Sequence, residues 1–402
     1  MASCCIASSS ADQRPSDVSD SIELPLSLYV HLPWCVSKCP YCDFNSHSAG
    51  DAPPKESYLR AVEIDLKLEA ERAANRPLVS VFIGGGTPSF FTGAEIGQLI
   101  DVIAAEFCLQ PDIEITMEAN PGTLEHGDLH DYRSAGVSRI SLGAQSFDAE
   151  SLRKLGRIHG PDEIHSAYAD AVRAGFDSIN LDIMFALPGQ DLEMAVRDVE
   201  QATALGPAHI SYYQLTLEPN TVFHSNPPPG LPDEEESFVI QQQCHALLAE
   251  SAYEQYEISA FAKSGHRCRH NLNYWTFGDY LGAGAGAHGK FTGSGDEIRR
   301  YEKPRHPASF IEQAELRSIE TREHEVSGAD IGFEFMLNTM RLPEGFMASD
   351  YSARTGLSVD TLEGRLAVAE ARGLIESFDG PGWRPTTLGL RFLNDLTATF
   401  LP

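Results

Sequence analysis

Three cysteines follow one another in a C-x3-C-x2-C spacing, as Cys35, Cys39 and Cys42. The loop that carries them comes directly after an apolar run that is typical of a β-strand. Three thiolates in one small volume can bind three of the four irons of a [4Fe-4S] cluster. The fourth iron then has no protein ligand, so it can chelate a small molecule. The spacing therefore predicts an iron–sulfur cluster with one open iron.

A structural zinc site is the alternative that this spacing leaves open. Zinc takes four ligands in a tetrahedron, so His31 or His47 would have to join the cysteines. The other cysteines suggest no paired framework, so we expect no disulfides; they are Cys4, Cys5, Cys108, Cys244 and Cys268. Thiolates that bind a cluster need a reducing compartment, which predicts a cytoplasmic protein.

The composition excludes several classes of partner. The chain of 402 residues has a formal net charge of −28. Phosphate binding rests on clustered basic charge, so no nucleic-acid partner is expected. No apolar run reaches the ~18 residues that a membrane-spanning helix needs, so no membrane insertion is expected. Residues 1–24 are small, polar and acidic, which is typical of a disordered leader rather than of a signal or transit peptide.

Short apolar strands alternate with amphipathic helices from Leu26 to about Ile258, which predicts a parallel sheet with right-handed crossovers. Periodicity does not tell an open sheet of six strands from a closed barrel of eight. The expected strands are Leu28–Leu32, Val79–Ile83, Ile113–Met117, Ser138–Leu142, Ser178–Met184 and Ile210–Leu217. The expected helices include Tyr58–Ala74, Ala94–Phe107, Asp191–Ala204 and Glu235–Ala252.

A change of pattern follows the glycine-rich stretch Tyr280–His288, and we expect 291–326 to be a linker. Residues 327–402 then predict a smaller, winged-helix-like α+β domain. Its expected elements are helices at Ala329–Asn338, Ala348–Thr355 and Val359–Ala371, an apolar segment at Leu374–Phe378, a turn at Gly380–Gly382 and a last helix from Thr387. In so acidic a chain, this domain is expected to be a lid or a docking module rather than a reader of DNA.

Polar motifs follow the expected strands. Gly84-Gly85-Gly86-Thr87-Pro88 comes after the second strand, where glycines let the backbone approach a ligand closely. Barrel active sites form at strand ends, so one mouth would collect these motifs with four polar residues: Glu118, Gln145, Arg157 and Asp182. Asp182 lies within an apolar strand, which is costly for an unpaired carboxylate. We therefore expect Arg157 to be its partner.

The stretch from Tyr29 to His288 resembles the coproporphyrinogen dehydrogenase-like family of the radical S-adenosylmethionine (SAM) superfamily, and within it the heme chaperones. The motifs that carry this resemblance are Tyr29-Val-His-Leu-Pro-Trp-Cys, Cys-Pro-Tyr-Cys-Asp-Phe-Asn-Ser, Gly-Gly-Gly-Thr-Pro-Ser, Leu-Gly-Arg-Ile-His, Tyr-Gln-Leu-Thr-Leu-Glu-Pro-Asn-Thr and His270-Asn-Leu-Asn-Tyr-Trp275. The resemblance implies a radical SAM core over 25–290, built as an α/β partial (β/α)6 barrel.

The resemblance also implies roles for individual residues. Cys35, Cys39 and Cys42 would hold the [4Fe-4S] cluster, and SAM would occupy its open iron. The residues expected to contact this SAM are Tyr29, Gly85 and Glu118. Those expected to line the nucleotide pocket are Tyr41, Gly86, Thr87, Gln145, Arg157 and Asp182. Whether one or two SAM molecules bind stays open.

Two functions of different classes follow from the resemblance. In the first, the protein binds heme and delivers it to an apo-hemoprotein. In the second, it is an oxygen-independent coproporphyrinogen III oxidase that uses a 5′-deoxyadenosyl radical to decarboxylate two propionates. By the same resemblance, the decarboxylating enzymes have the cysteine spacing C-x3-C-x2-C-x-C. In this chain Phe44 stands at the position of their fourth cysteine. This difference favours the chaperone, with an electron donor as a further partner and a cluster that can promote homodimers.

The motif His270–Trp275 is the expected heme site. A neutral imidazole is a good axial ligand for heme iron, and the rings of Tyr274 and Trp275 offer a flat apolar surface to a porphyrin. We expect His270 to be the ligand. Three nearby residues are alternative ligands: His266, Cys268 and His288.

Overall fold

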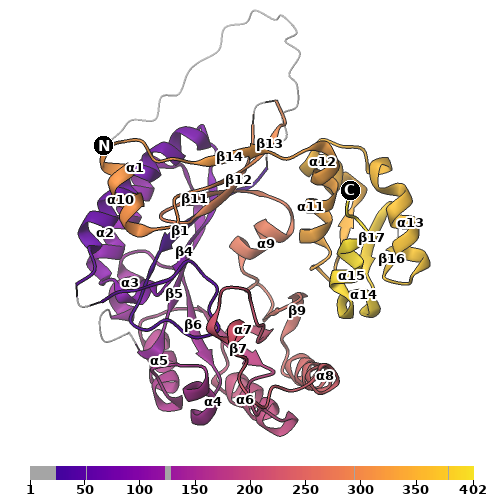
Figure 1. The fold of residues 1–402 in the computed structure, drawn as a ribbon, viewed down its shortest axis with the longest axis horizontal. Helices are drawn as coiled ribbons and strands as arrows, with labels where there is room; N and C mark the ends of the chain where they lie inside the picture. Colours follow the sequence, from indigo (N-terminus) through magenta and orange to yellow (C-terminus); the bar gives the residue numbers. More distant parts are fainter. Residues whose placement is uncertain (1–23, 51, 123–127, 294, 379) are drawn as a thin grey trace, which may run out of the picture.

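The computed structural model describes residues 24–50, 52–122, 128–293, 295–378 and 380–402 (Figure 1). Apart from Leu24, the expected leader 1–24 lies outside the described residues, and so do Cys4 and Cys5. No helix in the described part of the chain is long and apolar enough to cross a membrane.

The centre of the fold is a curved parallel sheet, as expected. Its strands lie in the order β11-β1-β4-β5-β6-β7-β8, and each pair of neighbours is parallel. All six expected strands are present: β1 (Leu26–Leu32), β4 (Leu78–Gly85), β5 (Leu109–Ala119), β6 (Arg139–Gln145), β7 (Ser178–Phe185) and β8 (His209–Gln214). The sheet does not close, because antiparallel strands continue it at both sides.

Alternation along each strand separates the core from the site. In β1, Leu26, Leu28 and Val30 are fully buried in the core that also contains residues of α1 (Lys55–Ala73). The residues between them point to the other face of the sheet, because successive side chains of a strand alternate. The inner face of the sheet therefore carries polar side chains, and the outer face is apolar.

Helices cover the outer face of this sheet (Figure 1). They are α1, α2 (Gly93–Glu106), α3 (Leu129–Ser134), α4 (Ala149–Lys154), α5 (Pro161–Arg173), α6 (Leu192–Leu205) and α8 (Glu234–Glu250). Their ends follow local chemistry. Thr92 and Glu95 form a capping box at the start of α2, in which the Glu95 N–H donates to Thr92 Oγ1 and the Thr92 N–H donates to Glu95 Oε2.

A seventh parallel strand, β11 (Asp279–Ala283), pairs with β1. It lies in the glycine-rich stretch where the sequence suggested a boundary. A Cβ at Gly282 would come within 2.2 Å of the His288 carbonyl oxygen on β12 (His288–Thr292), so this hairpin needs glycine. Here glycine marks a close backbone approach within a sheet rather than the end of a fold.

The stretch 291–326, expected as a linker, is folded onto the core over most of its described length. It carries β13 (Ile298–Glu302), α10 (Pro307–Glu315) and β14 (Arg322–Glu325), and the two strands continue the large sheet. Phe310 of α10 is fully buried, with its ring 5.5 Å from that of Tyr58 on α1. The buried apolar residues of this stretch are widely spaced in the sequence. They form no regular pattern, so the sequence did not predict these elements. The other edge of the sheet is formed by β10 (Ala260–Ala262) and β9 (Glu254–Glu257).

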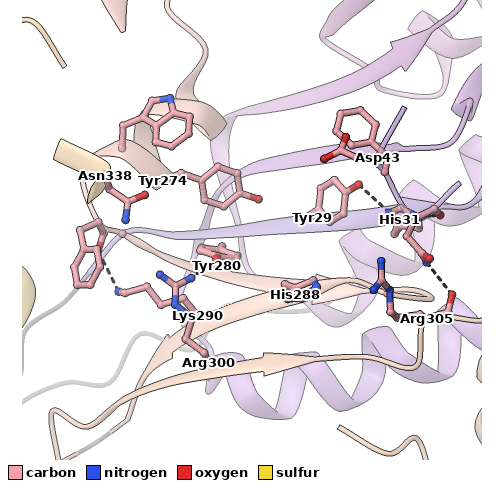
Figure 2. Close-up of a pocket in the computed structure, with 16 residues that line it drawn as sticks. Tyr29, His31, Asp43, Tyr274, Tyr280, His288, Lys290, Arg300, Arg305 and Asn338 are labelled. Carbon is pink, nitrogen blue, oxygen red and sulfur yellow. Dashed lines mark hydrogen bonds between the residues drawn. The ribbon is translucent and has the colours of Figure 1, made fainter. Parts of the chain in front are cut away.

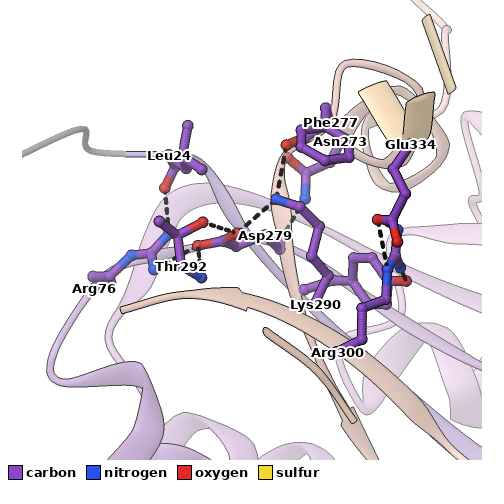
Figure 3. Close-up of polar contacts among 10 residues, drawn as sticks. Leu24, Arg76, Asn273, Phe277, Asp279, Lys290, Thr292, Arg300 and Glu334 are labelled. Carbon is purple, nitrogen blue, oxygen red and sulfur yellow. Dashed lines mark hydrogen bonds and ion pairs between the residues drawn. The ribbon is translucent and has the colours of Figure 1, made fainter. Parts of the chain in front are cut away.

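A buried polar network fixes β11 and β12 to the rest of the sheet (Figure 3). Asp279 accepts from Lys290 Nζ at 3.0 Å and from Arg76 Nη1 at 2.8 Å. Burial alone would raise the pKa of Asp279, but Lys290 and Arg76 together hold it below its usual value. Lys290 also donates to the carbonyl oxygen of Phe277 at 3.1 Å. The network therefore ties the strands to the segment that follows α9 (Arg269–Trp275).

The C-terminal part of the chain has a core of its own, as the expected α+β domain requires. Its helices are α11 (Gly328–Thr339), α12 (Ala348–Thr355), α13 (Glu363–Ala371), α14 (Thr387–Arg391) and α15 (Leu393–Ala398), with a 3-10 turn at Val359–Leu362. Its sheet has the order β15-β17-β16, with β15 (Phe346–Met347), β16 (Ile375–Phe378) and β17 (Gly382–Pro385). Phe335, Tyr351 and Phe400 are fully buried in this core, which Phe277 and Ile298 also join.

Candidate cofactor site

The cysteine loop is closed at its base by a two-stranded ladder. β2 (Trp34–Cys35) pairs with β3 (His47–Ser48). The His47 N–H donates to the Pro33 carbonyl oxygen at 2.7 Å, and the Ala49 N–H donates to that of Cys35 at 2.9 Å. These bonds hold both ends of the loop against the end of β1, so the loop lies over the carboxyl ends of the parallel strands.

All three predicted cluster ligands line one cavity of about 340 Å³. Each of their sulfurs also has a polar neighbour. Thr87 Oγ1 donates to Cys35 Sγ at 3.4 Å, Arg157 Nη1 donates to Cys39 Sγ at 3.6 Å, and Ser46 Oγ lies 3.7 Å from Cys42 Sγ.

The donor set fits a cluster. Burial raises the pKa of the Cys35 and Cys42 thiols, while the hydroxyls of Thr87 and Ser46 act in the opposite direction. Cluster binding requires thiolates, so donors aimed at sulfur favour the form that iron binds.

The zinc alternative finds no support at the two histidines that it needs. His31 Nδ1 lies 2.9 Å from Tyr29 Oη, and His31 Nε2 lies 2.9 Å from the Asn45 carbonyl oxygen, so both ring nitrogens have partners. His47 lines another hollow, where its ring centroid is 5.6 Å from that of His306. Neither histidine lines the cysteine cavity.

The glycine triplet allows β4 to end against the start of the cysteine loop. Gly85 has a φ of +116°, and a Cβ there would come within 2.5 Å of the His31 ring. A Cβ at Gly86 would lie 2.6 Å from the backbone carbon of Pro33. Both glycines and Thr87 line the cavity, as expected. Their N–H groups have partners within the protein, because Gly85 donates to Glu118 Oε2 at 3.1 Å and Gly86 donates to the Leu32 carbonyl oxygen at 2.7 Å.

Glu118 lies near the end of β5 on the inner face and lines the cavity. Burial first, and then the nearby Asp182, raise the pKa of its carboxyl group to about 8. The bond from the Gly85 N–H acts in the opposite direction. A carboxyl group with a raised pKa is suited to bind a cationic ligand group, because a nearby positive charge stabilises its ionised form.

Asp182 also lines the cavity, but the expected pairing with Arg157 is wrong. Asp182 accepts instead from Ser141 Oγ at 3.0 Å and from Asn180 Nδ2 at 2.8 Å. Arg157 Nη2 donates to the Gly143 carbonyl oxygen at 2.8 Å, and the same guanidinium reaches Cys39. Neutral donors from β7 itself and from the neighbouring strand β6 bond the Asp182 carboxyl group, and the Arg157 guanidinium bonds the cysteine loop instead.

Gln145 ends β6 in a conformation that few residues adopt. Its φ is +68°, and the pairing of β6 with β7 shifts register just before it. The Tyr213 hydroxyl donates to Gln145 Oε1 at 2.8 Å. Strained backbone of this kind is found where a functional side chain must be aimed. The side chains of Gln145 and Tyr41 both line the cysteine cavity, as expected.

Sequence reasoning missed several lining residues, among them Ser141, Met184 and Tyr213. Each lies on the inner face of a predicted strand, so strict alternation from Asp182 or Gln145 would have found Ser141 and Met184. Tyr213 begins a quoted motif, Tyr-Gln-Leu-Thr, to which no role was assigned.

Tyr29 lies in a second, neighbouring cavity of about 490 Å³ rather than in the cysteine cavity (Figure 2). We call it the aromatic cavity, because six aromatic side chains line it: Tyr29, Phe44, Tyr274, Trp275, Phe277 and Tyr280. Asp43 and Phe44 line both cavities, so the two adjoin at the end of the cysteine loop. The contact between Tyr29 and SAM stays a prediction.

His270, expected as a heme ligand, is buried in α9 and does not line the aromatic cavity. Its Nδ1 lies 3.0 Å from Ser80 Oγ and its Nε2 lies 2.8 Å from Tyr274 Oη, so both nitrogens have partners. Burial, and then Arg139, lower the pKa of its imidazole to about 3. Tyr274 and Trp275 of the same motif do line the cavity. The structure therefore supports the expected aromatic surface but offers no free nitrogen at His270.

Comparisons with known proteins agree with this architecture. Residues 29–202 match the family model described as the radical SAM superfamily, and residues 326–392 match the HemN C-terminal domain. The heme chaperone HemW of Escherichia coli (strain K12) is 48% identical over 94% of this chain and 98% of its own length. HemW of Haemophilus influenzae is 45% identical over the same shares. The solved coproporphyrinogen III oxidase (HemN) of Escherichia coli superposes with a TM-score of 0.79 at 22% identity, over 95% of this chain and 91% of that chain, which is a likeness of fold.

Proposed function

Because the chain belongs to the HemW family of the radical SAM superfamily, we propose that it is a heme chaperone. It would bind heme and deliver it to an apo-hemoprotein. The observation that carries this proposal is the 48% identity to a heme chaperone across nearly the whole of both chains. The aromatic cavity supports it, because a porphyrin needs a broad apolar surface and this cavity offers one beside the cysteine loop.

The cysteine cavity would hold the cofactors of the family. Cys35, Cys39 and Cys42 would bind a [4Fe-4S] cluster, with the hydroxyl of Thr87 and the guanidinium of Arg157 donating to two of the sulfurs. When bound, a reduced cluster would supply one electron to the sulfonium group of a SAM molecule that occupies its open iron. The electron would come from a donor protein, which we propose as a second partner.

Side chains at the strand ends would bind SAM. Glu118 would pair with its ammonium group, because the pKa of this carboxyl is raised and a cation relieves its cost of ionisation. Gly85 and Gly86 would let the end of β4 lie directly against the start of the cysteine loop, which brings the strand ends close to the bound cofactors. The residues that would line the nucleotide part are Tyr41, Thr87, Gln145, Arg157 and Asp182.

Phe44 favours the chaperone over the decarboxylating enzyme. Its side chain is 60% exposed and lies where the two cavities adjoin. A phenyl ring there cannot supply a thiol, but it can extend the apolar surface offered to a porphyrin. Phe44 therefore adds apolar surface where the two cavities adjoin, and it has no thiol that could take part in redox chemistry.

The proposed domains are a core over 25–290 and an accessory domain over 327–402. The structure leads us to group 291–326 with the core rather than to treat it as a linker. We propose a reducing, cytoplasmic setting, because the cluster needs reduced thiolates. A dimer is proposed only in the cluster-loaded state.

The test is anaerobic and uses the full chain. The cluster is reconstituted, and two assays then run in parallel: heme binding with transfer to an apo-acceptor, and formation of protoporphyrinogen from coproporphyrinogen III with SAM and a reductant. We expect stable heme binding and transfer without decarboxylation. Robust decarboxylation would overturn the chaperone in favour of the dehydrogenase.

A further inference from the structure

We propose that Asp198 is a positioning residue of the SAM site, whose carboxylate holds the turns after β6 and β7 and thereby aims the side chain of Gln145 into the cysteine cavity. This inference rests on the proposed function and deepens it, because Asp198 itself does not line the cavity. It lies on α6, which packs against β7 on the outer face of the sheet (Figure 1).

The two strands end in backbone conformations that few residues other than glycine adopt. Gln145, the last residue of β6, has a φ of +68°, and Ala186, which directly follows β7, has a φ of +57°. Such conformations cost free energy, and they persist where the surrounding contacts hold them. The two turns that begin here therefore need an anchor.

One carboxylate binds both turns. Asp198 Oδ1 accepts from the Phe147 N–H at 2.7 Å, in the turn after β6. Asp198 Oδ2 accepts from Ser146 Oγ at 2.8 Å, in the same turn, and from Gln190 Nε2 at 3.3 Å, in the turn after β7. Gln190 Oε1 in turn accepts from the Leu187 N–H at 3.2 Å. Asp198 and Gln190 therefore link the ends of two neighbouring strands.

The Asp198 carboxylate depends on these donors. Its side chain is 2% exposed, and it forms no ion pair with a basic side chain in the described part of the chain. Burial, and to a smaller extent Asp148, raise the pKa of this carboxyl to about 6, whereas the bonds from the two turns act in the opposite direction. The group is therefore mostly ionised at pH 7. A buried carboxylate without a counter-charge is costly unless it is hydrogen-bonded, so the carboxylate and the turns stabilise each other.

Gln145 is the residue through which this anchor reaches the cavity. It directly precedes Ser146 in the chain, and its side chain lines the cysteine cavity. The Tyr213 hydroxyl donates to Gln145 Oε1 at 2.8 Å, which fixes the orientation of the amide. Gln145 Nε2 forms no hydrogen bond with a described residue, so it can donate to an acceptor on the nucleoside part of SAM. A shift of the turn would move this donor.

An amide at position 198 would keep the shape of the side chain but not its bonds. Both oxygens of a carboxylate accept, whereas asparagine has one acceptor oxygen and one donor nitrogen. Asp198→Asn can therefore keep the bond from Phe147 or the bonds from Ser146 and Gln190, but not both sets. The turn that loses its bond is then free to relax from its strained conformation.

The experiment measures SAM affinity of the anaerobically reconstituted full chain by equilibrium dialysis. Asp198→Asn should weaken SAM binding by roughly three- to tenfold, the loss of about one hydrogen bond, with iron content unchanged. Asp279→Asn is the matched control, because Asp279 is also a fully buried carboxylate with several donors but begins β11, at the end of the parallel strands away from the cysteine loop. It should keep the wild-type affinity. Wild-type affinity in Asp198→Asn, or an equal loss in both variants, would overturn the inference.

A double-mutant cycle tests whether Asp198 acts through Gln145. In a Gln145→Ala background, Asp198→Asn should have no further effect on SAM affinity, because the donor that it positions is gone. Additive losses would overturn the inference. Ser146→Ala is a milder variant for the case that Asp198→Asn does not fold, since it removes one donor and leaves the bond from Phe147. It should weaken SAM binding by roughly two- to threefold, and again only when Gln145 is present.

The electron paramagnetic resonance spectrum of the reduced cluster separates positioning from a general loss of the site. Saturating SAM should change this spectrum equally in the wild type and in Asp198→Asn, because the amino acid part of SAM at the open iron does not depend on Gln145. A different response would mean that the cysteine loop has moved, and would overturn the inference. If the wild type binds no SAM, the proposed cofactor fails and the inference fails with it. If the wild type binds SAM and Asp198→Asn binds it equally well, the cofactor stands and the inference alone is overturned.

Discussion

Glu118 combines a raised pKa with a position at the strand ends beside the cysteine loop. Burial and the neighbouring Asp182 raise the pKa of its carboxyl group to about 8, so at pH 7 the group is mostly protonated when the cavity holds no cation. If Glu118 pairs with the ammonium group of SAM, the bound state needs the carboxylate. Binding must then release a proton wherever the pH is below about 8.

This linkage predicts how SAM affinity depends on pH. Affinity of the cluster-loaded protein should rise between pH 6 and pH 8, by up to roughly tenfold per pH unit, and then level off above the free pKa. Titration calorimetry in two buffers of different ionisation enthalpy measures both the affinity and the proton release. Glu118→Gln should bind more weakly with a flat profile. The same slope in the glutamine variant would show that another group titrates.

The cysteines allow a simple test of the cluster assignment. Cys39→Ala should lose the brown chromophore and most of the iron, because the cluster would keep only two thiolate ligands. Cys108→Ala is the matched control, since Cys108 is exposed and does not line the cysteine cavity. Absorbance and iron content after anoxic purification measure both variants. Zinc in place of iron in the wild type would contradict the assignment.

The sequence predicted the members of the site better than their contacts. Alternation along a strand tells which face a residue occupies, and strand order tells which ends meet, so Glu118, Gln145 and Asp182 could be placed at one mouth. The partner of Asp182 depends on the register between β6 and β7, which sets Ser141 opposite Asn180. That register is a property of the folded sheet, so the expected pairing with Arg157 was wrong.

At the scale of elements, the end of β4 is fitted to the cysteine loop through Gly85. Its φ of +116° is strained for any other residue, and an added Cβ would overlap the His31 ring. Gly85→Ala should therefore destabilise the protein by about 1–3 kcal/mol and reduce cluster retention. Thermal unfolding and iron content measure the two effects.

Gly265→Ala is the matched control for this variant. Gly265 also has a positive φ, +83°, but a Cβ there would meet nothing within 4 Å. It carries the backbone strain without the collision, so iron content should stay at the wild-type level. If both variants lose iron equally, the packing of β4 against the loop is not what holds the cluster.

Elements with strong periodicity could be predicted, and the strands that extend the large sheet beyond β1 could not. The six central strands are apolar on one face and bury it against long helices, so their pattern is regular. β11 contains Gly282 because β12 approaches closely, and β13 has the sequence Ile-Arg-Arg-Tyr-Glu. Glycine and charge are typical of loops, but these two strands carry them inside the sheet, where β11 lies between β12 and β1 and β13 lies between β14 and β12. Their side chains Tyr280 and Arg300 line the aromatic cavity, so they are not part of an apolar face with a regular pattern.

At the scale of the whole molecule, the C-terminal domain contributes to the lining of the aromatic cavity and packs against the core beside it. Asn338 of α11 lines the cavity, and Phe277 and Ile298 of the core pack among the apolar residues of this domain. Ion pairs join the two parts: Arg300 with Glu334 at 2.7 Å, and Arg341 with Glu257 of β9 at 3.1 Å. A ligand in the cavity would therefore contact both parts of the chain.

The pair of Arg341 and Glu257 offers a test of whether contact between the two parts of the chain holds a ligand in the cavity. Glu257 is buried, and Arg341 also lies over the ring of Trp275, 4.3 Å from its centroid. Arg341→Ala leaves a buried carboxylate unpaired and frees one face of a tryptophan that lines the aromatic cavity. We expect a loss of about 1–3 kcal/mol in the free energy of unfolding. We also expect heme to leave several times faster, because one wall of its cavity is loosened.

Arg384→Ala is the control, because Arg384 pairs with Glu376 on the exposed surface of the C-terminal domain and such pairs contribute little, about 0–1 kcal/mol. Thermal unfolding and stopped-flow transfer of heme to an apo-acceptor measure the two variants side by side. Faster transfer in Arg341→Ala alone would mean that contact between the two parts of the chain governs heme release. Equal transfer rates in the two variants would mean that the cavity holds heme through the core side chains, and that the C-terminal domain does not close over it.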